Sequence, residues 1–166
     1  MAPMESEPDS LQFPDDGRQS DGALAIRQGT AQLLIALNWT PLPEFTLPNG
    51  RRADIAALGP KGEHWIIEIK SSIADLRADH KWPEYRDYCD ALSFAVSPEM
   101  PLDLPPGDCG LIVADRHGAE IIREAPNHPL SAARRKALTL RYARAAVNRL
   151  ARGGETDAWR FETTLI

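Results

Sequence analysis

Cysteine is scarce in this chain of 166 residues, and no stretch of apolar residues is long. The two cysteines, Cys89 and Cys109, form no CxxC pair and cannot build a disulfide framework, so we expect reduced, partly buried thiols. No apolar run approaches the roughly 18 residues of a membrane span, and the acidic N-terminus lacks the basic and apolar regions of a signal peptide. Glycine-rich phosphate loops, dinucleotide fingerprints and Ser/His/Asp arrangements are missing too. These absences argue against a disulfide-stapled or membrane-bound protein and favour a cytoplasmic one.

What the chain does contain is the composition of an ordinary globular domain, 43% hydrophobic and 26% charged. The formal net charge of −5 is unevenly distributed, with −5 on residues 1–22, −2 on residues 153–166 and +2 on the body from 23 to 152. We therefore predict a disordered acidic arm over 1–20, a folded domain over 21–152 and a C-terminal tail over 153–166. The arm is either a solubilising tail or a segment that competes with a polyanion for the basic body.

Hydrophobic periodicity and turn residues predict an α/β fold, with one mixed sheet flanked by helices. Asp21 is expected to cap a first helix that stops near Asn38. Ser72, with Asp75 three residues later, is expected to open a second helix. The predicted strands span 42–47, 51–58, 64–70, 91–96, 110–114 and 119–123, the first three forming a meander, and a long helix follows from 131 to about 152.

The third predicted strand carries an acid and a base on one face. Glu68 and Lys70 lie roughly 6.6 Å apart along the strand and point the same way, while Trp65, Ile67 and Ile69 form an apolar face. In the preceding strand, Asp54 lies near the position that pairs with Glu68. We expect the two carboxylates and the amine to converge on one patch.

Such a patch supports metal-assisted hydrolysis of a phosphodiester. Asp54 and Glu68 can hold Mg²⁺ or Mn²⁺, with the backbone carbonyl of Ile69 as a third protein ligand. Lys70 can then orient or activate a water, or stabilise the charge of the transition state. The alternative is an ordinary half-exposed strand, in which an Asp paired with a Lys is a surface contact worth ~0 to 1 kcal/mol.

The residues around this patch resemble those of two nested families. Asp54 followed by Glu68-Ile69-Lys70 resembles the core of the PD-(D/E)XK nucleases, and a longer pattern resembles the MmcB-like DNA repair proteins of bacteria. That longer pattern comprises residues 51–55, 64–72, 75, 79–85 and 110–115 and the Arg134-Arg135-Lys136 helix. The resemblance spans about 23 to 152 and implies a restriction-endonuclease-like fold with a role in DNA repair or damage tolerance.

Two departures from the nuclease pattern concern the metal ligands. Ala53 stands where the superfamily's name has proline, and the first predicted helix offers only Gln28 and Gln32 where many members place a further acid. Glu44, on the first strand, is the nearest substitute by sequence. We therefore expect Asp54 and Glu68 as metal ligands, with Glu44 as a candidate third carboxylate.

The long final helix has seven basic residues and no acid between 131 and 154. On a helical wheel, Ala133, Ala137, Leu140, Val147 and Ala151 form one stripe, which we expect to be buried. The opposite arc is expected to be a ridge for DNA phosphates, or merely a solvated face that balances the acidic ends. It comprises Arg134, Arg135, Arg141, Arg149 and Arg152.

Other candidate DNA contacts lie nearer the carboxylates. Arg51 and Arg52 flank Asp54 at the strand entrance and are expected to contact phosphate. Tyr85 is a candidate for stacking on a base, whereas Trp82 is interpreted as a core residue. His64 and His80 are interpreted as solvent-edge histidines, since no Cys/His cluster predicts a zinc site.

The sequence thus favours a Mg²⁺-dependent DNA endonuclease that cuts damaged or branched DNA. One alternative is a catalytically inactive nuclease-fold module that binds DNA or another repair protein. A second alternative is an adaptor that contacts no nucleic acid and docks an acidic partner on its basic helix. A membrane partner is not expected, and the pattern leaves the oligomeric state open.

Overall fold

A computed structural model describes residues 20–153, and the predicted arm and tail lie outside these residues apart from Ser20 and Gly153. The described elements follow the order α1 (Asp21–Ala36), β1 (Thr40–Thr46), β2 (Arg52–Leu58), β3 (His64–Lys70), α2 (Ile73–Ala78), the 3-10 helix η1 (Trp82–Tyr88), β4 (Ala91–Val96), β5 (Gly110–Asp115), β6 (Gly118–Arg123) and α3 (Ala132–Gly153). Every predicted strand is present, with its ends shifted by at most two residues.

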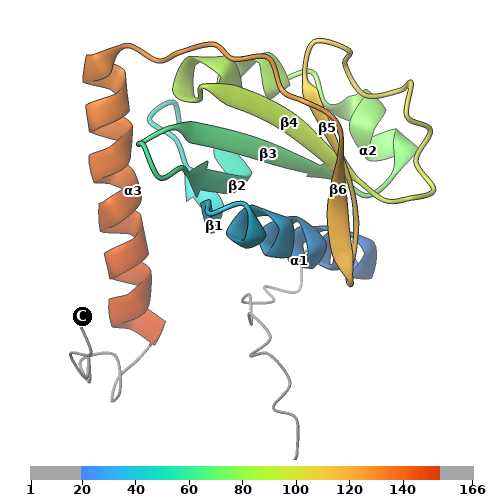
Figure 1. Ribbon diagram of the computed structural model, residues 1–166, viewed down its shortest axis with the longest axis horizontal. Helices are drawn as coiled ribbons and strands as arrows, with labels where there is room; N and C mark the ends of the chain where they lie inside the picture. Colours follow the sequence, from blue (N-terminus) through green and yellow to red (C-terminus); the bar gives the residue numbers. More distant parts are fainter. Residues whose placement is uncertain (1–19, 154–166) are drawn as a thin grey trace, which may run out of the picture.

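The six strands form one mixed sheet in the order β1-β2-β3-β4-β5-β6. The first three strands are antiparallel, as the predicted meander requires. Strands β3, β4 and β5 then run parallel to one another, and β6 returns antiparallel to β5. Helices lie on the two sides of this sheet, so the predicted mixed α/β architecture is confirmed (Figure 1).

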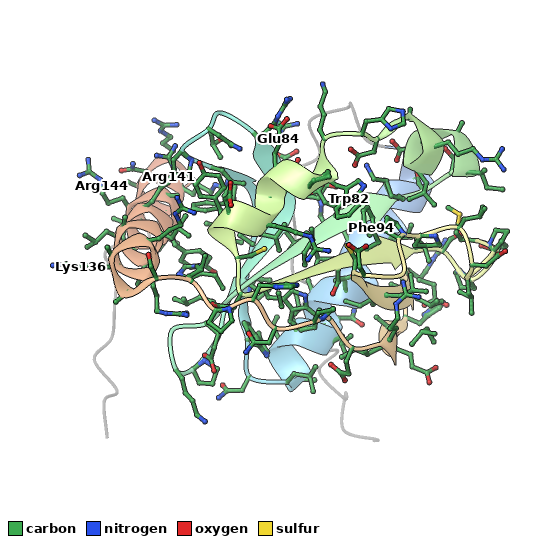
Figure 2. The ribbon with its side chains drawn as sticks, turned by 90° about the horizontal axis from the view of Figure 1, so that it is seen from above. Trp82, Glu84, Phe94, Lys136, Arg141 and Arg144 are labelled. Atoms are coloured by element: carbon green, nitrogen blue, oxygen red, sulfur yellow. The ribbon has the colours of Figure 1, made fainter. Side chains whose placement is uncertain are left out.

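Both faces of the sheet are covered, because helices pack on each of them. On one face, Ile26 and Leu34 of α1 pack against Ile55, Ile67 and Ile112. On the other face, side chains from η1 and α3 pack against the second apolar cluster, in which Trp82 stacks edge-on against Phe94 with ring centroids 6.0 Å apart (Figure 2). Trp82 is therefore a packing residue, as predicted. Every residue of β3 is buried, which corrects the interpretation of His64 as a solvent-edge residue.

The start of α1 differs from the prediction by one residue. Ser20, not Asp21, is the N-cap, and its hydroxyl accepts a hydrogen bond from the backbone N–H of Ala23 at 3.2 Å. The helix ends at Ala36, and Asn38 has a φ of +63°, a left-handed conformation that asparagine tolerates better than most residues. The prediction for α2 is confirmed, since the Ser72 hydroxyl accepts from the N–H of Asp75 at 3.1 Å.

Helix α3 is turned the opposite way from the prediction. Leu138 and Tyr142 are its buried residues, whereas Leu140 and Val147, expected in the core, are 57% and 58% exposed. The arginines opposite the apolar stripe explain this orientation, because they donate hydrogen bonds to the body of the protein. Tyr142, on the same side, packs on Phe45 with ring centroids 5.8 Å apart. A helical wheel separates the two faces correctly but carries no information about which face meets the protein.

Both cysteines are free, as expected, and both are buried more completely than the expected partly buried thiols. Desolvation raises the pKa of the Cys89 thiol to about 12 and that of Cys109 to about 11, so neither is a reactive thiolate at neutral pH. Within the described residues, no helix combines the length and the apolar character needed to cross a membrane.

Candidate active site

Asp54 and Glu68 lie where β2 and β3 part. The backbone ladder between these strands reaches Ile55 opposite Ile67, and the next residues on each strand are Asp54 and Glu68. At this point carboxylate side chains replace backbone carbonyls as hydrogen-bond acceptors between the strands. The N–H of Asp54 donates to Oε1 of Glu68 at 3.1 Å, and the N–H of Ile69 donates to Oδ2 of Asp54 at 2.8 Å. These reciprocal hydrogen bonds hold the two carboxylates next to one another, as the hairpin phase predicts.

Lys70 ends β3 and makes an ion pair that the sequence did not foresee. Its Nζ lies 2.7 Å from Oδ2 of Asp79, and both side chains are nearly buried, at 9% and 11% exposure. The Oδ1 atom of Asp79 accepts hydrogen bonds from the N–H groups of Lys81 and Trp82, which fixes the carboxylate after α2. Asp79 therefore positions the ammonium group of Lys70.

The three predicted site residues open into one pocket of about 690 Å³. Asp54, Glu68 and Lys70 line it together with Asp75 and Asp79, and the side chains of Arg51, Arg52 and Lys81 belong to the same lining. Ser20 and Ala23 place the first turn of α1 at its wall. One concave site therefore contains the carboxylates, Lys70 and three further cationic side chains.

Burial dominates the electrostatics of the carboxylates. Desolvation raises the pKa of Glu68 well above its ordinary value, and the neighbouring charge of Asp54 adds to this rise. Desolvation also raises the pKa of Asp54, although the hydrogen bond from Ile69 and the charge of Lys70 oppose it. Burial acts against the charged form of Lys70, but the hydrogen bond and charge of Asp79 outweigh burial and raise the pKa of the amine. The site therefore holds two carboxylates whose charged forms are disfavoured by burial, beside a lysine whose charged form is favoured by Asp79.

The raised pKa of Glu68 predicts that the free energies of unfolding of Glu68→Gln and the wild type differ in a pH-dependent way, which urea unfolding in EDTA measures. Because the folded-state pKa of Glu68 is raised, the wild-type protein should lose free energy of unfolding as pH rises from the ordinary glutamate pKa through the raised one. Glutamine keeps an acceptor for the Asp54 N–H but does not ionise. The variant should equal or exceed the wild type at pH 7 and lose this advantage near pH 4; an advantage that grows toward acid would contradict the assignment.

The donor set fits a cation that keeps much of its water. Two adjacent carboxylates, a buried one on Glu68 and a half-buried one on Asp54, are the ligands that Mg²⁺ accepts, with water completing its shell. Between residues 20 and 153, no group of three His, Cys, Asp or Glu side chains is arranged to hold a metal ion. The geometry thus suits a hard, largely hydrated ion and not a closed cage of zinc type.

Glu44 does not belong to this pocket. Its Oε1 lies 3.6 Å from Nη2 of Arg27 and 3.8 Å from Nη2 of Arg52, and its backbone is left-handed, with a φ of +52°. Arg27, on α1, is 1% exposed, and its Nε and Nη2 atoms find no hydrogen-bond partner among residues 20–153. Glu44 therefore pairs with Arg27 and Arg52 and does not line the pocket. The sequence pattern did not reveal this pairing.

The three other residues expected to contact DNA near the carboxylates, Arg51, Arg52 and Tyr85, differ in exposure and in their hydrogen-bond partners. Arg51 pairs with Glu84 at 2.8 Å, and the side chain of Arg52 is 54% exposed. Tyr85 lines the pocket, but it is only 7% exposed and its hydroxyl donates to the carbonyl of Arg52 at 3.2 Å. A buried ring held in this way serves as the wall of the pocket.

Most arginines of the predicted ridge on α3 are already engaged with the body. Arg135 contacts Asp90 at 2.6 Å, Arg141 donates to the carbonyl of Thr46, and Arg149 donates to those of Pro43 and Glu44. Arg134 lies over the ring of Tyr88 and donates to the carbonyl of Asp87. Arg152 is exposed at the end of the helix. These contacts anchor α3 and leave fewer free donors than the wheel implied.

The fold and the pocket define a class: an α/β protein that gathers two carboxylates and a lysine where two antiparallel strands separate. A family model described as "DNA repair protein MmcB-like" matches residues 11–157. The chain belongs to the MmcB-like family of DNA repair proteins.

A solved structure is similar as well. The SPO1766 protein of unknown function from Silicibacter pomeroyi is 43% identical, with a TM-score of 0.76 over 79% of this chain and 90% of that one. A comparison with curated proteins gives no match.

Proposed function

We propose that this DNA repair family member is a Mg²⁺-dependent or Mn²⁺-dependent endonuclease of the PD-(D/E)XK type, acting on damaged or branched DNA. One observation carries the proposal: Asp54, Glu68 and Lys70 line a single open pocket at the parting of β2 and β3. A restriction-endonuclease-like assignment for the mixed sheet is part of the same proposal. The cytoplasm is the compartment that we expect for this activity.

Asp54 and Glu68 would hold the metal ion, with the carbonyl of Ile69 as a further ligand. When bound, the ion supplies positive charge to a phosphate oxygen and lowers the pKa of a coordinated water. The hydrogen bonds from Ile69 and Asp54 keep both carboxylates in place. Burial raises the pKa of both acids, and the charge of Asp54 raises that of Glu68 further, so a bound cation would offset the cost of burying these negative charges side by side.

Lys70 acts as a fixed positive charge in this proposal. Its pKa is raised because Asp79 accepts its hydrogen bond at 2.7 Å, so the amine stays protonated at neutral pH. A protonated amine does not remove a proton from water. Lys70 therefore orients the attacking water or phosphate and stabilises the negative charge that develops on the phosphate oxygens.

DNA would approach through the cationic side of the pocket. Arg52 and Lys81 are exposed and line it, and Arg51 adds a guanidinium that Glu84 already orients. Such contacts bind phosphate without reading sequence, which suits a protein that recognises a DNA structure. Other repair proteins are further partners in this proposal.

The Arg52→Ala variant should bind DNA more weakly and with a smaller salt dependence. Loss of one phosphate contact reduces the slope of log affinity against log salt by about 1. Fluorescence anisotropy with a labelled branched DNA in EDTA, at several salt concentrations, measures this slope without cleavage. Arg116→Ala, an exposed arginine in the turn between β5 and β6, is the matched control and should leave the slope unchanged. Equal slopes for Arg52→Ala and wild type would remove Arg52 from the interface.

The decisive test of the function is metal-dependent nicking of supercoiled plasmid and of branched DNA by the purified chain. Wild-type protein should nick with Mg²⁺ or Mn²⁺ and fail in EDTA. Binding that survives in EDTA, with no nicking under any metal, would instead identify a binding module without catalysis.

A further inference from the structure

The outward side of α3 carries an apolar stripe. Leu140, Ala143, Val147 and Leu150, called here the outer stripe, follow the spacing of three and four residues that places side chains on one side of a helix. Leu140, Val147 and Leu150 are 57%, 58% and 60% exposed. Figure 1 shows α3 standing at one end of the molecule, and Lys136 and Arg144 extend from its side away from the sheet in Figure 2.

The exposure of the outer stripe follows from how α3 is anchored. Arg135, Leu138 and Tyr142 hold the opposite side of the helix against the body, through the Asp90 ion pair and through core contacts. Rotating the helix to bury the outer stripe would break these contacts. Three large apolar side chains in a row on an exposed helix indicate a surface that another segment covers.

The charges beside the outer stripe select an acidic occupant. Lys136 and Arg144 are exposed, and α3 contains no Asp or Glu. A second α3 laid against the first would bring like charges together. An occupant that offers both apolar side chains and carboxylates would satisfy the stripe and its cationic edges at once.

Residues 155–166 of this chain have that chemistry. They contain Trp159, Phe161, Leu165 and Ile166, and their acids Glu155, Asp157 and Glu162 outnumber the single Arg160. The N-terminal residues 1–19 are more acidic, but they spread the same number of large apolar side chains over more residues and include only one aromatic ring, Phe13. We propose that residues 155–166 bind along the outer stripe of α3, with Trp159 and Phe161 against Val147 and Leu150.

The length of the chain permits this contact. Residues 155–166 begin directly after Gly153 and Gly154 at the end of α3. The distance along a helix from Leu150 back to Leu140 is about 15 Å, while twelve extended residues reach about 40 Å. Because the segment is tethered to the helix that it covers, its effective concentration is in the millimolar range and a weak contact suffices.

Indole N–H signals in ¹H–¹⁵N spectra of the full chain test the proposal. The chain has four tryptophans, and Trp159→Phe assigns one signal by its loss. The Trp159 signal should lie away from its position in concentrated urea in the parent, and should move to that position in Val147→Asp and in Leu140→Asp. The remaining indole signals should stay in place, which shows that the core of either variant is folded.

Leu102→Asp is the matched control, because Leu102 is 45% exposed and lies in the loop between β4 and β5, at the other end of the molecule from α3 (Figure 1). It should leave the Trp159 signal unmoved. A Trp159 signal that is the same in the parent, Val147→Asp and Leu140→Asp would overturn the proposal. A signal that shifts with protein concentration, together with the mass of two copies in light scattering, would overturn it in favour of a second copy.

Discussion

Replacing Glu68 with glutamine should reduce Mg²⁺-dependent nicking of supercoiled DNA by at least about 100-fold, the scale on which loss of one charge-stabilising group acts in an active site. The substitution keeps the size of the side chain and an oxygen that accepts the Asp54 N–H, which lies 3.1 Å away in the parent. It removes the negative charge that would hold the metal ion. The effect should therefore fall on metal binding and catalysis, with the fold retained.

Two measurements separate catalysis from folding in this variant. The thermal midpoint in EDTA should be no lower than that of the wild type, because glutamine avoids the burial of a carboxylate that is 4% exposed. Titration with Mg²⁺ should raise the wild-type midpoint and leave that of Glu68→Gln nearly unchanged, since only an ion that binds the folded state stabilises it.

Glu120→Gln is the matched control for these assays, because Glu120 is an exposed glutamate on β6 outside the pocket. It should nick as fast as the wild type and keep the response to Mg²⁺. If Glu68→Gln also nicked at the wild-type rate, Glu68 would have no catalytic role. The carboxylate pair would then be a structural feature of the strand junction.

Replacing Asp90 with alanine should lower the free energy of unfolding by about 3 kcal/mol, the lower end of the cost of removing one partner from a buried ion pair, because Asp90 is buried while Arg135 is 29% exposed. Asp90 is 5% exposed and accepts four hydrogen bonds, from the N–H groups of His64 and Leu130 and from two nitrogens of Arg135. It thus ties α3 to β3 and to the segment before α3. Alanine would remove the acceptor of all four hydrogen bonds, and only Nη1 of Arg135 would keep another acceptor, the carbonyl of Gly62 at 2.8 Å.

Urea unfolding measures this loss. A second Asp–Arg pair whose arginine also lies on α3 provides the control. Asp87 lies 3.9 Å from Arg134, and its side chain is 76% exposed. Asp87→Ala should therefore cost less than about 1 kcal/mol. Similar losses for the two variants would mean that Asp90 does not anchor α3.

The stabilisation from Asp90 should also depend on pH. Burial opposes ionisation of Asp90, but the hydrogen bonds from Arg135, His64 and Leu130 outweigh it and lower the pKa. The contribution should be complete above the ordinary aspartate pKa and disappear as pH falls through the lowered one. Asp90→Asn should flatten this acid limb of the stability curve.

The strands and the phase of the candidate site could be predicted from the sequence. Side chains alternate along a strand, so Glu68 and Lys70 had to share a face of β3. A hairpin between β2 and β3 then left few registers that place Asp54 anywhere but beside Glu68. Similarly, the hydroxyl of Ser72 caps α2 through a contact only three residues long.

Contacts between distant segments were beyond this reasoning. The pairing of Lys70 with Asp79, the transfer of Glu44 to Arg27 and Arg52, and the four bonds to Asp90 all join elements whose relative placement no local pattern specifies. The orientation of α3 is the clearest case. Its wheel showed an apolar side and a basic side, and burial of the apolar side was the expected outcome.

The sequence alone therefore determined the strands, the cap of α2 and the shared face of the acid and the lysine, because these depend on backbone periodicity and on neighbours a few residues apart. The tertiary structure alone decided which side of α3 meets the body and which charges become partners. Backbone carbonyls of β1 and the buried carboxylate of Asp90 offered the arginines charge-assisted hydrogen bonds, and these outweighed the burial of Leu140 and Val147.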